Sequence, residues 1–126
     1  MQPLAREWVE KAEGDFATAQ REYRARQSPN YDGGCFHAQQ MAEKYLKAYL
    51  QEYNLPIPRT HDLIELEILC LNRDPTFGMI EPDLKNLNAY AILFRYPGQN
   101  AEKEDLKNAL KSARVVRDFM RTQLKC

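Results

Sequence analysis

The chain has 126 residues, enough for one domain around one hydrophobic core, so we expect residues 1–126 to form a single domain. Its 18 Lys and Arg balance its 18 Asp and Glu, which excludes a net charge that draws the whole protein to nucleic acid or an acidic membrane. The three cysteines lack the spacing of a disulfide framework or a zinc site, and no stretch is apolar enough to span a bilayer. We therefore expect a soluble, cytoplasmic protein with reduced thiols, no cofactor and no metal.

Apolar residues recur every three or four positions along most of the chain, which is the pattern of amphipathic helices. Each such set of apolar residues forms a stripe along one face of a helix. The first stripe predicts a helix over about residues 4–26, and the composition of residues 28–34 predicts a loop. The second stripe predicts a long helix over residues 35–53. A third, shorter helix is expected over residues 61–71, with Thr60 as its N-cap.

The last third of the chain predicts two more helices after a loop at residues 72–79. Pro82 suits the first turn of the fourth helix, which residues 97–98 (Pro-Gly) stop. Asn100 is the expected N-cap of a fifth helix that ends near Lys125. No segment alternates with the period of a strand, so we predict an all-α fold, an up-and-down antiparallel bundle of four to five helices.

Charge is distributed unevenly along the chain. Residues 61–90 hold six acidic and two basic residues, a net charge of −4, and residues 103–126 hold seven basic and three acidic ones, a net charge of +4. These two regions can attract each other or a second copy of the chain. Five basic residues fall along one side of the last helix, where they form either a solvated face or a track for phosphates: Lys107, Lys111, Arg114, Arg121 and Lys125.

Few residues are candidates for catalysis. His37 and His61 are the only imidazoles, and His37 is either a polar-face residue or part of a site. His61 and Asp62 form the pair of an HD metal site, but the further ligands are missing, which favours a structural role at a helix start. Glu43 and Lys47 are four residues apart and are expected to form an exposed ion pair. Phosphate-loop, dinucleotide-binding and serine-hydrolase motifs are absent.

Four segments, taken together, resemble the HEPN domain family, whose name abbreviates a nucleotide-binding domain of higher eukaryotes and prokaryotes. They are Trp8 with Ala12 and Asp15, CFHAQQMAEKYLKAYL at residues 35–50, RTHDL at residues 59–63, and FRYP at residues 94–97. The resemblance spans about residues 4–124. It implies a homodimeric bundle of four to five helices in the cytoplasm of a microbe. Short members are often paired with a minimal nucleotidyltransferase, in toxin-antitoxin systems or in nucleotide-binding roles.

The resemblance also implies the place of a functional site. Many HEPN relatives are metal-independent ribonucleases, with an arginine followed after four to six residues by a histidine near the start of the last helix. Two such motifs meet at the dimer interface. Arg95 stands at the position of the arginine, but Asn100, Ala101 and Glu102 occupy the positions where the histidine belongs. None of these three replaces an imidazole near neutral pH.

We therefore expect a module without catalytic activity that binds a nucleotide, a nucleic acid or a nucleotidyltransferase partner around Arg95, near the first N–H groups of the last helix. The expected roles are phosphate binding by Arg95 and Lys44, stacking by Tyr96, and shaping of the site by His37 and Glu43.

Three alternatives stay open at this point. Arg95 either caps the carbonyl groups of its own helix or pairs with an acid such as Glu43, and then has no binding role. The protein can instead be a ribonuclease in which folding brings His37 or His61 next to Arg95. A plain assembly partner that binds no nucleotide is the third alternative, and it would leave an apolar patch exposed.

Overall fold

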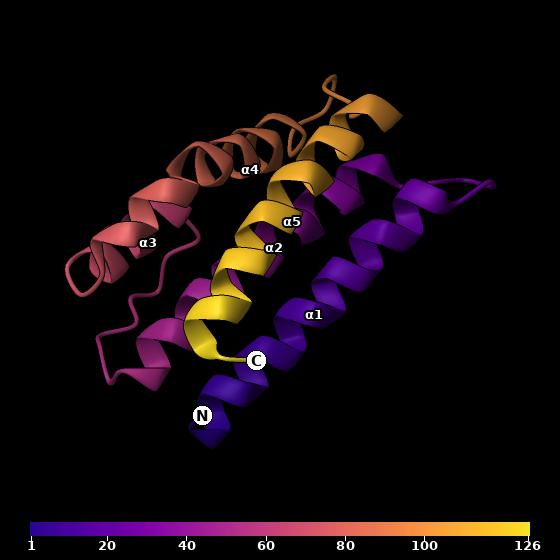
Figure 1. The fold of residues 1–126 in the computed structure, drawn as a ribbon. Helices are drawn as coiled ribbons and strands as arrows, with labels where there is room; N and C mark the ends of the chain where they lie inside the picture. Colours follow the sequence, from indigo (N-terminus) through magenta and orange to yellow (C-terminus); the bar gives the residue numbers. More distant parts are fainter.

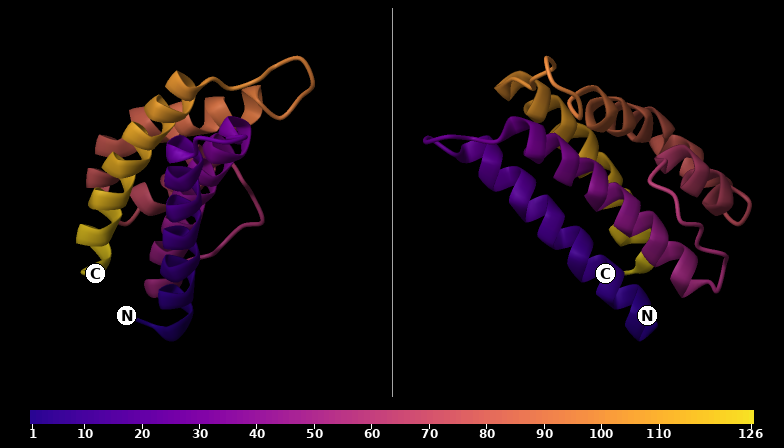
Figure 2. Two further views of the ribbon diagram at one scale, coloured as in Figure 1. Left: turned by 90° about the vertical axis from the view of Figure 1, so that its right-hand side faces the viewer. Right: turned by 180° about the vertical axis from the view of Figure 1, so that it is seen from behind.

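The computed structural model describes residues 1–126, and its regular structure is entirely helical. In chain order the elements are α1 (Pro3–Arg24), α2 (Tyr31–Glu52), α3 (Leu63–Leu71), the 3₁₀ helix η1 (Pro75–Ile80), α4 (Glu81–Leu93) and α5 (Lys103–Leu124). α1 and α2 run in opposite directions, α3 and α4 return together along the other side, and α5 runs back, so both termini lie at one end (Figure 1; Figure 2). The predicted all-α helical bundle is confirmed.

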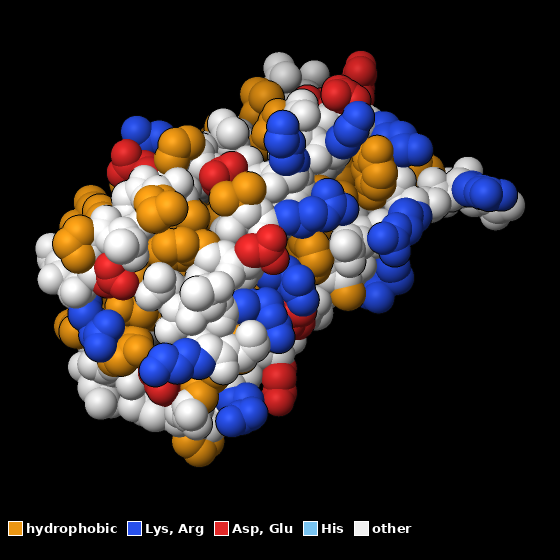
Figure 3. Space-filling view, viewed as in Figure 1, with side chains coloured by type: hydrophobic (Ala, Val, Ile, Leu, Met, Phe, Trp, Pro, Cys, Tyr) orange, Lys and Arg blue, Asp and Glu red, His pale blue; other side chains and the backbone are white.

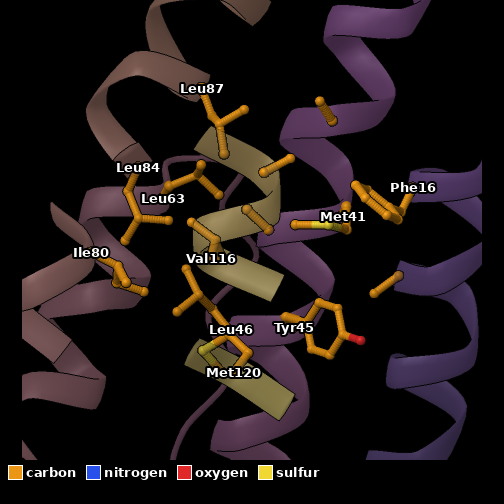
Figure 4. Packing of buried hydrophobic residues seen from close by; sticks show 14 of the residues in the cluster. Phe16, Met41, Tyr45, Leu46, Leu63, Ile80, Leu84, Leu87, Val116 and Met120 are labelled. Atoms are coloured by element: carbon orange, nitrogen blue, oxygen red, sulfur yellow. The ribbon is translucent and has the colours of Figure 1, made fainter. Parts of the chain in front are cut away.

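α2 is the central helix of the bundle. It packs against α1, α3, α4 and α5, and 13 of its 22 residues are buried. The hydrophobic core is one cluster of 27 buried residues, in which Phe16 of α1 faces Met41 and Tyr45 of α2, while α4 contributes Leu84 and other side chains from the opposite side (Figure 4). None of the helices combines the length and the apolar character that crossing a membrane requires.

The start of α2 differs from the prediction. The helix begins at Tyr31 rather than near Cys35, because the side chain of Asn30 accepts a hydrogen bond from the backbone N–H of Gly33 at 2.8 Å. This cap allows the glycine pair that composition assigns to a loop to form the first helical turn. The loop between α1 and α2 covers residues 25–30 rather than 28–34, because α1 also ends earlier than predicted, at Arg24.

The caps of α3 and α5 were also assigned to the wrong residues. Asp62, not Thr60, is the N-cap of α3, and its side chain accepts the N–H two residues further on at 2.9 Å. At the start of α5, Glu102 and Asp105 form a capping box, so the helix does not begin at Asn100. In both cases a carboxylate a few residues downstream of the predicted cap satisfies the free N–H groups.

The segment at residues 72–79 was predicted as a loop but contains most of η1. Phe77 is fully buried, and its ring centroid lies 4.6 Å from that of Tyr49 and 5.1 Å from that of Phe119. A short 3₁₀ helix has too few residues to show a periodic apolar pattern, which explains why the sequence did not reveal it.

The opposite charges of residues 61–90 and 103–126 do not pair with each other, since no ion pair joins the two regions. The basic side chains of α5 that do form ion pairs contact α1 instead. Arg117 and Arg121 lie 2.7 Å and 3.8 Å from the carboxylate of Glu13, which also accepts a hydrogen bond from the buried Tyr45 hydroxyl.

Candidate functional site

Arg95 lies two residues after the last residue of α4, in the turn that leads to α5, and is exposed to solvent. Its backbone N–H donates to the carbonyl of Ile92 at 3.3 Å, but its guanidinium makes no hydrogen bond or ion pair within the chain. Arg95 therefore neither caps its own helix through its side chain nor pairs with Glu43. All five donors of the guanidinium are available to a ligand.

Arg95 lines two neighbouring cavities. The first has a volume of about 250 Å³ and is here called the Arg95 cavity; its lining residues are Gln39, His61, Asp62, Asn88, Ala91, Ile92 and Arg95. The second, of about 320 Å³, lies between Arg95 and the start of α2, where Asp32 and Phe36 contribute to its wall. Both cavities are open to solvent.

Hydrogen bonds fix most polar groups of the Arg95 cavity. The amide of Gln39 donates to the backbone carbonyl of His61 at 2.7 Å, and the amide of Asn88 donates to the carboxylate of Asp62 at 2.9 Å. These bonds tie the loop before α3 to α2 and to α4. The nitrogen groups of the cavity that remain unbonded are the guanidinium of Arg95 and Nε2 of His61.

His61 is held in place by Glu43. Its Nδ1 lies 2.9 Å from Oε1 of that carboxylate, which also accepts hydrogen bonds from Lys47 at 3.0 Å and Gln40 at 3.2 Å. Because an ionised carboxylate only accepts hydrogen bonds, Nδ1 of His61 carries the proton and Nε2 is free to accept one or, when protonated, to donate.

The Glu43–Lys47 ion pair exists, but the prediction that it is exposed was wrong. The two side chains are only 4% and 10% exposed. His61 covers the carboxylate, and the ammonium of Lys47 lies 5.7 Å from the ring centroid of Trp8 on α1. Burial of such a pair is tolerated because several donors surround the carboxylate.

His37 and Lys44 belong to a different cluster. Nδ1 of His37 and Nζ of Lys44 lie 2.7 Å and 2.5 Å from the two oxygens of Asp15, which α1 contributes and whose side chain is 10% exposed. Neither residue lines a cavity together with Arg95. This cluster joins α1 to α2, and nothing in the spacing of the sequence shows that Asp15 binds both partners.

Tyr96 is 64% exposed and lines neither cavity. Acidic side chains already bind several N–H groups at the start of α5, among them that of Asp105, which donates to Glu102. The N–H of Ala101 donates to Asp32 at 2.6 Å, and that of Glu102 donates to Asp105 at 2.8 Å. These acidic side chains place negative charge next to the helix terminus, which disfavours a phosphate there.

Gln39 and Asn88 were missed as candidate site residues. Gln39 lies within the QQMAEK segment, beside Gln40, so its position on α2 was a usable signal. Asn88 is an isolated polar residue on α4, and its place in the cavity depends on how α4 packs against the loop before α3.

The model of the HEPN domain family matches residues 5–123. The chain belongs to the HEPN domain family. The crystal structure of TT1696 from Thermus thermophilus shares the fold of this HEPN domain with a TM-score of 0.77, at 25% sequence identity over 96% of this chain and 98% of that chain. No curated protein matches the sequence. The family resemblance of the sequence is confirmed.

Proposed function

We propose that this HEPN domain is a binding module, without catalytic activity of its own, that holds a nucleotide or a nucleic acid by a phosphate in the Arg95 cavity. The observation that carries the proposal is the guanidinium of Arg95, which has no partner within the chain and lines an open cavity beside His61. A guanidinium binds phosphate oxygens through two parallel hydrogen bonds. Nε2 of His61 lies in the same wall and donates a further hydrogen bond when the ring is protonated.

The carboxylate of Asp62 narrows the class of ligand. It lines the same cavity and caps α3, so it is a fixed negative charge close to Arg95 and His61. A bare phosphate is repelled by this carboxylate, whereas a nucleotide can donate a ribose hydroxyl or a base amino group to it. We therefore expect nucleotides to bind more tightly than inorganic phosphate.

Replacing Arg95 with alanine is expected to weaken nucleotide binding at least ~10-fold, because a hydrogen bond to a charged group contributes about 1.5–3 kcal/mol. Calorimetric titration of the parent and of Arg95→Ala with ATP, GTP, AMP and inorganic phosphate measures this change. Arg6→Ala is the matched control, since Arg6 is an exposed arginine in the first turn of α1 that lines a different cavity. Equal affinity of parent and Arg95→Ala, or no binding by the parent, would refute the site.

A second candidate function rests on one specific observation. His61 is held by Glu43 and lines the cavity of Arg95, so folding brings an imidazole next to the arginine from the loop before α3 rather than from the start of α5. In a ribonuclease, Nε2 of His61 would act as general acid or base and Glu43 would orient the ring.

The two candidate functions predict different fates for RNA. A binding module leaves a labelled single-stranded RNA intact on prolonged incubation, which is the expected result for the parent protein on a denaturing gel. Cleavage that His61→Ala and Arg95→Ala both abolish, and that Glu43→Gln reduces, would establish the ribonuclease instead. His37→Ala is the control, because His37 lies in the Asp15 cluster and not in the cavity.

We also propose that the domain forms a homodimer through the end of α4 and that it associates with a nucleotidyltransferase, as in toxin-antitoxin pairs. Support comes from large apolar side chains next to Arg95: Ile92 is 60% and Leu93 48% exposed. Two adjacent exposed apolar side chains at this helix end would be covered in such an interface. Light scattering on the purified protein gives the oligomeric state, and co-purification from the native cell identifies the partner.

A further inference from the structure

The basic residues of α5 differ in how they are used. Arg117 and Arg121 bind Glu13 of α1 and help to hold α5 in place. The other four basic residues of α5 and its C-cap Lys125 are exposed and have no ion pair, although the ammonium of Lys103 lies 5.1 Å from the ring centroid of Tyr23. These five residues define the α5 basic face: Lys103, Lys107, Lys111, Arg114 and Lys125. Figure 3 shows Lys and Arg side chains gathered over α5 and the adjoining part of α1.

The α5 basic face is a long line rather than a compact patch. Its first four members are three or four residues apart, which places them on one side of the helix. At a rise of about 1.5 Å per residue, the line from Lys103 to Lys125 is about 33 Å long. That length equals about ten nucleotides at 3.4 Å per nucleotide of one strand. Asp118 is the one acidic residue in the middle of this side.

The composition of this face does not suit a protein partner. The centre of a protein interface is apolar and rich in aromatic side chains. On α5, Val115 is the only large hydrophobic residue that is exposed, at 44%. A row of cations that lack ion-pair partners, without an apolar centre, suits a linear polyanion, which it binds by releasing counterions.

We propose that the α5 basic face binds the phosphodiester backbone of a nucleic acid, independently of base sequence. This site is separate from the Arg95 cavity, whose residues come from α2, α4 and the loop before α3. The α5 basic face goes beyond the proposed function in the kind of ligand it recognises. The Arg95 cavity holds a single phosphate, whereas the α5 basic face binds several phosphates along one strand at the same time. Arg117, fixed by two hydrogen bonds to Glu13 at 2.7 Å and 2.8 Å, keeps the face rigid beside α1.

The test is fluorescence anisotropy with a labelled oligo-dT of about 12 nucleotides and with a duplex of the same length, at salt concentrations from about 50 to 200 mM. For the parent and the single strand, four to five phosphate contacts predict a slope of log K against log salt of about −3. Lys107→Glu/Lys111→Glu is expected to weaken binding at least ~10-fold at the lowest salt and to reduce the slope by about 1.4, because two contacts are lost.

The control Lys11→Glu/Arg59→Glu changes the net charge equally on exposed residues outside the face, one on α1 and one in the loop before α3, and it is expected to bind like the parent. Calorimetric titration of Lys107→Glu/Lys111→Glu with ATP reports on the Arg95 cavity alone, because neither lysine lines it, so failure of the Arg95 cavity and failure of this face give different results. Absence of binding by the parent at the lowest salt, or equal weakening by both double variants, overturns the proposal. Circular dichroism confirms that each variant is folded.

Discussion

Replacing Phe77 with alanine is expected to lower the free energy of unfolding by about 3–5 kcal/mol, the usual cost of removing a buried aromatic side chain. Phe77 is fully buried in η1, and its ring packs edge-on against the rings of Tyr49 and Phe119. The substitution removes both aromatic contacts and leaves a cavity between α2, η1 and α5. Urea denaturation at pH 7 measures the change. If unfolding stays two-state, the slope of the free energy of unfolding against urea concentration is the same in the variant and the parent.

Met79 provides the matched control, because it lies in the same 3₁₀ helix and is 73% exposed. Met79→Ala is expected to change the free energy of unfolding by no more than about 0.5 kcal/mol. If Phe77→Ala cost as little as Met79→Ala, η1 would not belong to the core, and the contacts of its phenylalanine would not contribute to stability.

Replacing Glu67 with glutamine is expected to stabilise the protein at pH 8. Glu67 is fully buried on α3, and neither oxygen of its carboxyl has a hydrogen-bond partner. Burial, together with the nearby carboxyl of Glu81, raises the pKa of Glu67 to about 7, and Lys85 opposes the shift. Between its ordinary pKa of 4.5 and about 7, the folded state keeps a proton that the unfolded state releases.

This difference in bound protons makes the free energy of unfolding depend on pH. The folded state binds more protons, so the stability present below about pH 4.5 is lost as the pH rises through about 7. The full loss is ~3 kcal/mol, at 1.36 kcal/mol for each unit of pKa shift. Glutamine is neutral at every pH, and Glu67→Gln should therefore gain ~3 kcal/mol over the parent at pH 8 and little at pH 4.5.

Chemical denaturation of the parent and of Glu67→Gln at several pH values between 4.5 and 8 measures this difference. Taking the difference between two proteins cancels the contributions of all other titrating groups. Glu65→Gln, on the exposed side of α3, is the control and should follow the parent at each pH. A constant difference between Glu67→Gln and the parent over this range would show that Glu67 titrates normally.

The sequence by itself determined the five α-helices and their buried faces, but not the 3₁₀ helix η1. The stripe of α5 from Leu106 to Leu124 and most of the stripe of α2 from Cys35 to Tyr53 are buried as the spacing predicts. Helical geometry fixes which side chains of one segment share a face, and the apolar face must be removed from water. The same local information, through the segments around Lys44, His61 and Arg95, was sufficient for the family.

Only the tertiary structure decided which polar residues meet. The sequence grouped His37 and Lys44 with Arg95, but both bind Asp15 on α1, while Glu43 holds His61 in the wall of the Arg95 cavity. These residues come from segments far apart in the chain, and their distances depend on how the helices pack against one another. Periodicity within a helix contains no such information, because it reports the direction of a side chain and not the partner that it finds there.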